Sequence, residues 1–218
     1  MSEPLEWRDE EVELLQKHLA KFQSGNLKNF FARLRANGYQ SLYRFRNGVS
    51  WNKEERRFFM NLTSAAWVSL PTMIGEGGIN ITDQLFQQKA VDPVGFSQIE
   101  AILFHELVHA FVKNDSKLIE EFYHVIEFDK VWKQADGMAA DIQMSRQLIA
   151  AYSHMGDWNR AYIEQKEAGR RLGLPSLYAL ENISEALADV ATYVYLDPTS
   201  AEYIATPVRE WVLKNILN

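Results

Sequence analysis

The stretch AILFHELVHAFV, residues 101–112, places two histidines and a glutamate inside an otherwise apolar segment. Ser97, with Glu100 three residues later, is typical of a capping box, and the apolar residues that follow recur at helical spacing. The sequence therefore predicts a helix that begins near residue 97. His105 and His109 would lie one turn apart on the same face of this helix, where both can reach a single metal ion.

Glu106, the residue after the first histidine, can act as a general base in the HExxH pattern. It follows the first histidine and lies about 100° around the helix from it. From that position its carboxylate can approach a water activated by the metal, rather than the metal itself, and take a proton from it. A structural interpretation stays open, in which His105 and His109 are ordinary core histidines. A third ligand would decide between the two.

Composition limits the kinds of site and partner. The chain has 218 residues, enough for one domain with a sizeable core. It contains no cysteine, so disulfides, thiolate metal sites and cysteine nucleophiles are excluded, and a metal must be held by His, Asp or Glu. The net charge of −6, without a run of Lys or Arg, argues against nucleic acid as a partner.

Neither a secretory signal nor a membrane span is visible in the sequence. The N-terminus is acidic and lacks an apolar h-region, and the longest apolar stretch is too short and interrupted to cross a bilayer. We expect a soluble protein with no membrane partner, located in the cytoplasm or exported without a classical signal peptide.

Periodicity and breaker residues predict an α+β fold with a small mixed sheet early and a helical majority late. Outside the HELVH helix, helices are predicted over residues 8–23, 27–36, 53–66, 116–133, 136–155 and 159–172. A further helix is predicted to carry ENISEALADVATYVYL. A last helix is predicted to begin at Thr206 as its N-cap, with Pro207 as its first residue. Short strands are expected around a glycine-rich turn in WVSLPTMIGEGGINIT, residues 67–82, with the second strand at residues 79–82. We divide the chain into an N-terminal helical and extended region, 1–70, which can form a subdomain, and a catalytic domain, 71–218.

Asp115 is one candidate for the third ligand. It lies six residues after His109, where metzincin peptidases place theirs, but that layout needs a glycine at the position of Val112. Valine disfavours the positive φ with which the chain would turn back to the metal. We therefore expect Asp115 to end this helix or cap the next one.

Glu185, in SEALAD at residues 184–189, is the stronger candidate for the third ligand. Asp189 follows one turn later among apolar residues, where a buried carboxylate needs a partner. In the usual arrangement Glu185 would bind the metal and Asp189 would accept the distal N–H of a ligating histidine. A solvated helix face carrying both carboxylates is the alternative.

HELVH followed by SEALAD resembles the gluzincin metallopeptidases, the thermolysin-like clan, whose second motif has the form NExxSD. Within the clan the likeness is to the catalytic domain of anthrax lethal factor and its small bacterial relatives, and it covers roughly residues 75–211. The resemblance implies a zincin-like fold and one Zn²⁺ per chain, held by His105, His109 and Glu185. It also implies peptide-bond hydrolysis with Glu106 as the general base.

The same resemblance implies two further roles. Tyr178 lies seven residues before Glu185, where these enzymes carry a tyrosine that stabilises the oxyanion. GGINIT resembles the edge strand that pairs with the substrate backbone, so the substrate-binding residues would be Gly78, Ile79, Asn80 and Ile81.

One feature departs from the family. The 76 positions from His109 to Glu185 exceed the usual gap, which predicts an enlarged helical insertion at about 116–172. With such an insertion Tyr178 can equally be a core tyrosine.

The leading hypothesis is a zinc metallopeptidase, an endopeptidase that acts on proteins or peptides. A bacterial effector or toxin-type protease and a housekeeping peptidase fit the sequence equally well. Two other classes stay open: a zinc-binding regulatory or scaffold protein that does not cut, and a helical interaction protein in which HELVH is accidental. Metal content separates the interaction protein from the two zinc-binding classes. Peptide cleavage separates the peptidase from the zinc-binding scaffold.

Overall fold

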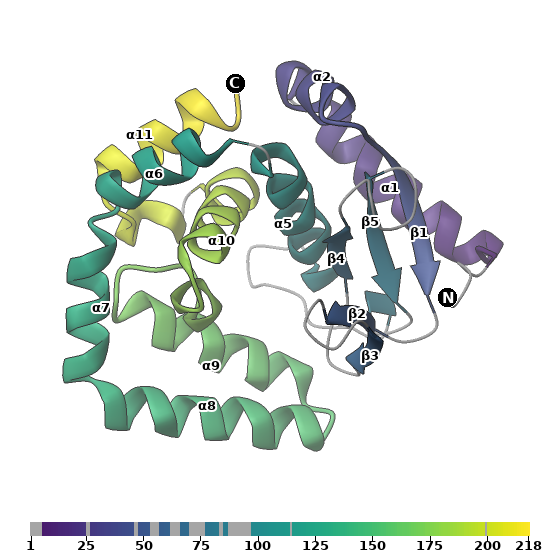
Figure 1. Ribbon diagram of the computed structural model, residues 1–218. Helices are drawn as coiled ribbons and strands as arrows, with labels where there is room; N and C mark the ends of the chain where they lie inside the picture. The colour runs from purple at the N-terminus through teal and green to yellow at the C-terminus, as the bar shows by residue number, and fades with distance from the viewer. Residues whose placement is uncertain are drawn as a thin grey trace.

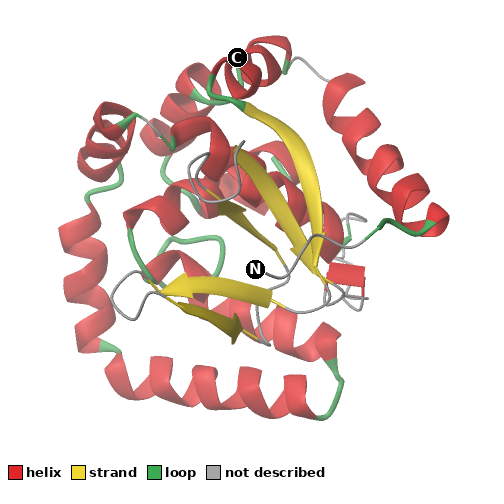
Figure 2. Ribbon diagram, turned by 45° about the vertical axis from the view of Figure 1, so that its right-hand side comes forward, coloured by secondary structure: helices red, strands yellow, loops and turns green. Residues whose placement is uncertain are grey.

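The computed structural model describes residues 6–24, 27–45, 48–52, 57–61, 66–69, 77–82, 85–86, 97–113, 115–198 and 200–218. These residues form a mostly helical protein with a small amount of β-sheet (Figures 1 and 2). In this coarse sense the predicted α+β class is confirmed.

Two helices open the described chain, as predicted. α1 covers Asp9–Ser24 and begins with three acidic residues, and α2 covers Lys28–Ala36 and carries two arginines in its last turn. Both charge patterns suit the partial charges at helix ends. Gly38 follows with a φ of +82°, a conformation that residues with a Cβ rarely adopt, and the chain enters the first strand there.

The larger sheet has three strands in the order β1-β5-β4. β1 covers Tyr39–Phe45, β4 covers Ala66–Ser69 and β5 covers Gly77–Thr82. β5 lies in the middle, parallel to β1 on one side and antiparallel to β4 on the other. The mixed sheet expected in the first part of the chain is therefore present.

A separate antiparallel pair overturns one predicted helix. β2 covers Gly48–Asn52 and pairs with β3, which covers Arg57–Asn61. The helix predicted over 53–66 is therefore wrong in its described part. RFFMN in β3 and GVSWN in β2 carry aromatic and β-branched residues that favour strands, and pairing between them outweighs the helical spacing of the segment.

The remainder of the described chain is helical. Its elements are α5 Gln98–Val112, α6 Ser116–Val125, α7 Phe128–Gly137, α8 Ala139–His154, α9 Trp158–Arg170, the 3-10 turn η1 Leu177–Leu180, α10 Ile183–Leu196, the 3-10 turn η2 Ser200–Tyr203, and α11 Thr206–Asn215. None of the helices in the described part of the chain is long and apolar enough to cross a membrane.

Two helix boundaries differ from the prediction. The helix expected over 116–133 is broken at Glu127, whose φ of +52° turns α7 away from α6, although no glycine or proline marks the place. The last helix has Ala205 rather than Thr206 as its N-cap, with Pro207 in its first turn.

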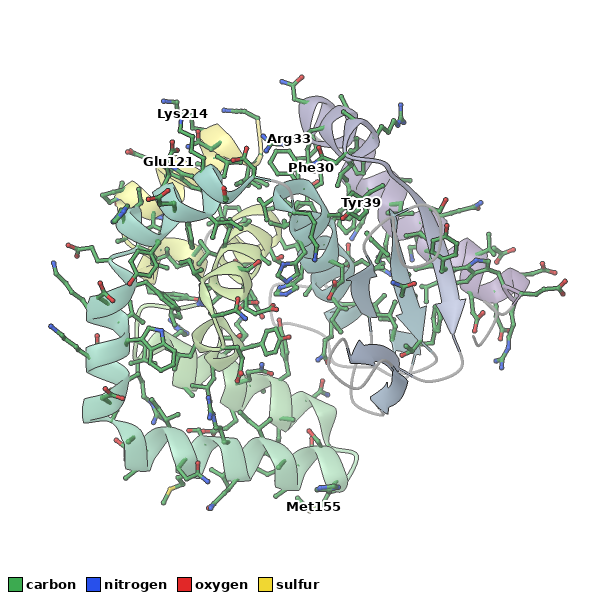
Figure 3. All side chains as sticks on the ribbon, in the orientation of Figure 1. Phe30, Arg33, Tyr39, Glu121, Met155 and Lys214 are labelled. Atoms are coloured by element: carbon green, nitrogen blue, oxygen red, sulfur yellow. The ribbon has the colours of Figure 1, made fainter. Side chains whose placement is uncertain are left out.

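The N-terminal helices share a core with the later part of the chain. Phe30 on α2 is fully buried, and its ring stacks on Phe104 and Phe111 of α5 at centroid distances of 5.6 and 4.8 Å. Figure 3 shows Phe30 between α2 and α5. α5 also packs against β4 and β5, and α10 packs against α5 from the other side (Figure 1). This central helix carries HELVH.

Candidate metal centre

The start of α5 is strongly defined by its own sequence. Ser97 is the N-cap and accepts a hydrogen bond from the Glu100 N–H at 3.2 Å, while the Glu100 carboxylate accepts one from the Ser97 N–H at 3.1 Å. This is the predicted capping box. Lys21 of α1 also donates to Glu100 at 2.6 Å. With the helix start held in this way, His105 and His109 project from one face.

α10 presents the third carboxylate from its first turn. Asn182 is the N-cap, and its side-chain oxygen accepts hydrogen bonds from the N–H groups of Ser184 and Glu185 at 2.9 and 3.1 Å. After Glu185 the helix continues with small buried residues such as Ala186 and Ala188, which allow it to pack closely on α5. The two helices thus bring HELVH and SEALAD together.

Three side-chain atoms converge between these helices. The Nε2 of His105 lies 2.8 Å from Oε2 of Glu185 and 3.0 Å from Nε2 of His109, and the His109 Nε2 lies 2.9 Å from the same Glu185 oxygen. His105 is buried, and His109 and Glu185 are partly buried. These three residues form a group that could hold a metal ion.

Hydrogen bonding alone does not satisfy this triangle. Each imidazole Nε2 carries at most one hydrogen, so a pair of N–H groups that both donate to Glu185 leaves the contact between the two nitrogens unfavourable. One cation bound at the centre would be held by all three atoms and would remove this conflict. Ligand atoms around a tetrahedral zinc lie roughly 3.3–3.5 Å apart, so a small outward movement of the three side chains accommodates the ion.

The electrostatics of the group in the metal-free protein favour a positive charge. Burial acts to raise the pKa of Glu185, but hydrogen bonds from His105 and His109 hold that pKa well below its usual range. Burial acts to lower the pKa of His105, and the hydrogen bond to Glu185 with the neighbouring carboxylates raises it above its usual value. In the metal-free protein these shifts favour the protonated imidazole of His105 beside the ionised carboxylate of Glu185, and a metal ion would compete with the proton on His105.

Glu106 lies beside the group without belonging to it. Its side chain is partly buried, and burial, its largest influence, raises the pKa of its carboxyl group. The charges of His105, His109 and Glu185 all act on it, which places it at the same site. Glu106 is therefore close enough to these three residues to be influenced by their charges, while its carboxylate is not one of the three converging groups.

Each histidine has a polar neighbour behind its ring. Asp189 Oδ1 lies 3.8 Å from Nδ1 of His105, too far for a hydrogen bond but within ion-pair distance. Asp189 thus lies beside His105, as the sequence predicted, but it does not accept a hydrogen bond from that ring. Ser184 Oγ lies 3.2 Å from Nδ1 of His109. Sequence reasoning missed Ser184, although its place immediately before Glu185 in SEALAD was a usable signal.

Tyr178 stands at the edge of the site. Its ring centroid lies 5.7 Å from that of His105, and its side chain is 45% exposed, so it is not a core tyrosine. Burial of the hydroxyl, together with the charges of Glu185 and Glu106, raises the pKa of Tyr178. The phenol therefore keeps its proton at neutral pH and can donate a hydrogen bond.

The other candidate for the third ligand, Asp115, lies elsewhere, as do two further histidines of the chain. Asp115 caps α6 by accepting from the Leu118 N–H at 3.0 Å, and Arg33 of α2 donates to it at 2.6 Å. It is thus the cap that the sequence predicted. His124 and His154 are exposed on α6 and α8.

The expectation that GGINIT is an edge strand is wrong. β5 is hydrogen-bonded to β1 and to β4, so its backbone offers no free edge to a substrate. Gly78, Ile79, Asn80 and Ile81 are also buried. Within the described sheet, β4 is an edge strand, and it packs against α5. The order of strands depends on pairing partners, which the sequence of one strand does not encode.

Comparisons with protein-family models, with curated proteins and with solved structures found no match to this chain.

Proposed function

We propose that this chain is a zinc-dependent metallopeptidase that hydrolyses peptide bonds, with a zincin-like fold and a gluzincin set of ligands. The observation that carries the proposal is the triangle of His105 Nε2, His109 Nε2 and Glu185 Oε2, with sides of 2.8 to 3.0 Å. Two imidazoles and a carboxylate are a ligand set of catalytic zinc sites, which keep a fourth position for water or substrate.

When bound in such a site, zinc polarises a carbonyl group and lowers the pKa of water to about 7. The residues of this chain supply the remaining functions. Glu106 accepts a proton from the attacking water and passes it to the leaving amine. Tyr178, with a protonated phenol at the edge of the site, donates a hydrogen bond to the oxygen that becomes negative in the transition state.

The substrate is proposed to be a peptide in extended conformation. β4 is an edge strand of the described sheet and packs against α5, the helix that carries both histidines. Strand addition uses main-chain hydrogen bonds and therefore needs an edge strand. Because β4 packs against α5, an extended peptide that adds to β4 would lie near the helix that carries His105 and His109. This role of β4 replaces the one expected of β5.

The test is peptide cleavage by zinc-loaded protein, followed by mass spectrometry of a mixed peptide library. Glu106→Gln should retain zinc and lose cleavage by a factor of at least about 10², the lower range for general-base catalysis. Glu181→Gln is the matched control, because Glu181 is an exposed carboxylate just before α10, paired with Arg146. Cleavage by wild type and Glu106→Gln at equal rates would refute the mechanism. Zinc binding without cleavage of any peptide would favour the scaffold alternative.

A further inference from the structure

The hydroxyl group of Ser176 joins two residues that flank the metal cluster. Ser176 is buried, with 5% of its surface exposed. Its hydroxyl donates to Oδ2 of Asp189 at 2.6 Å and accepts from the N–H of Tyr178 at 3.1 Å. Neither bond reaches the three converging residues, His105, His109 and Glu185, which we call the metal triangle. Asp189 and Tyr178, however, both lie next to that triangle.

On the Asp189 side, the hydroxyl fixes how the carboxylate is oriented relative to the histidine. The terminal torsion of an aspartate is broad, so a free carboxylate would rotate. Here Ser176 holds Oδ2, and Oδ1 is left 3.8 Å from Nδ1 of His105. Because Nε2 of His105 belongs to the metal triangle, the group behind Nδ1 decides how the ring is oriented.

On the Tyr178 side, the same hydroxyl caps a short helix. Ser176 is the N-cap of η1, and the capped N–H belongs to Tyr178 itself. The Tyr178 ring lies 5.7 Å from the His105 ring. One serine thus sets the position of the tyrosine and of the aspartate relative to a single histidine.

The helical insertion holds Ser176 in place. α9 ends in a Schellman turn, in which Leu174 N–H donates to Gly169 O at 3.0 Å, Gly173 N–H donates to Arg170 O at 3.0 Å, and Gly173 has a φ of +71°. This turn sends the chain back over α9. A Cβ on Gly169 would lie 2.3 to 2.7 Å from three backbone atoms of Ser176, so the two backbones touch where only glycine fits.

We infer that Ser176 is a positioning residue of the metal centre, and that α9 supports it through the close contact at Gly169. The inference rests on the proposed function, because it assigns Ser176 to the same zinc site. It also gives part of the insertion a role, since α9 packs against η1 and so lies behind the face of the site that carries Tyr178.

Zinc affinity of the full chain, measured by competition with a chelating indicator, tests the inference. Outer partners of metal ligands typically contribute 10- to 100-fold to affinity, and Ser176→Ala should weaken zinc binding by a factor in that range. Ser145→Ala is the matched control. Ser145, on α8, is also buried, and its hydroxyl donates a hydrogen bond of 2.7 Å to the carboxylate of Glu164 on α9. It should lose similar stability in urea and keep its zinc affinity within about twofold.

A second pair of variants tests the role of α9. Gly169→Ala forces the Ser176 backbone to move and should weaken zinc binding in the same direction as Ser176→Ala. Gly137→Ala, at a helical glycine of α7 with nothing within 4 Å, is its control. Should Gly169→Ala fail to fold, the serine pair still carries the test.

The outcomes separate the two proposals. Equal zinc affinity in wild type and Ser176→Ala overturns the positioning role and leaves the proposed function standing. Weaker zinc binding by Ser176→Ala in a protein that cleaves no peptide supports the positioning role and counts against the peptidase. A wild type that binds no zinc overturns both.

Discussion

Replacing Phe30 by alanine tests whether the N-terminal helices belong to the same folding unit as the helix that carries His105 and His109. Phe30 is 0% exposed and stacks on Phe104 and Phe111, the residues that flank HELVH on α5. A buried Phe→Ala change costs about 3–5 kcal/mol. Two stacked partners, each contributing about 0.5–1.5 kcal/mol beyond area burial, keep Phe30 away from the lower end of that range, and we expect a loss of about 4 kcal/mol.

The assay is urea and thermal unfolding followed by circular dichroism. For a chain of this size about 1 kcal/mol corresponds to roughly 2–4 °C, so Phe30→Ala should lower Tm by roughly 8–16 °C. A single cooperative transition is expected, because α2 and α5 share one core. Leu213→Ala is the control, since Leu213 is 48% exposed on α11, and it should change stability by less than about 0.5 kcal/mol. A loss below about 1 kcal/mol for Phe30→Ala, or a separate transition for residues 1–70, would refute the shared core.

Three further predictions concern α5, α6 and the metal-free site. Asp115→Ala should cost about 1 kcal/mol through loss of the α6 N-cap, seen in urea unfolding, with zinc affinity unchanged; a lost zinc site would mean that Asp115 is a ligand after all. Ser97→Ala should cost a similar amount by removing the capping box of α5, and an unchanged urea midpoint would contradict the role of that cap. In metal-free protein, the lowered pKa of Glu185 contributes stability above its ordinary value of 4.5 that is lost as pH falls, and the raised pKa of His105 contributes stability below its ordinary value of 6.5 that is lost as pH rises. The difference in unfolding free energy between wild type and Glu185→Ala should therefore be largest between about pH 4.5 and 6.5, and a difference constant from pH 4 to 9 would argue against these shifts.

Local signals made the two site helices predictable. The capping box of Ser97 and Glu100, the HExxH spacing and a carboxylate within an apolar helix are each visible within a few residues, and together they identified His105, His109 and Glu185 as a group. Their convergence also follows from packing, because both helices bury apolar residues on either side of the polar ones.

Features that depend on distant partners were not predictable. β3 resembled a helix until its pairing with β2 was known, and β5 resembled an edge strand although it lies between β1 and β4. Ser176 had no motif of its own, because its role depends on a turn at Gly173 and a close approach at Gly169. For the two strands, the deciding contact joins segments whose sequences carry no mark of one another. For Ser176 it is a close approach of backbones within one turn, which no pattern of residue types announces.

Zinc per chain, measured by elemental analysis on the purified 218-residue chain, is the most direct test of the proposed metal site. Glu185→Ala and Glu181→Ala should be measured beside the wild type, because only the first removes an atom of the triangle. Near one zinc per chain in wild type and Glu181→Ala, with most of it lost in Glu185→Ala, is the expected result. No zinc in the wild type after reconstitution would mean that His105 and His109 are ordinary core histidines. That result would refute the peptidase proposal.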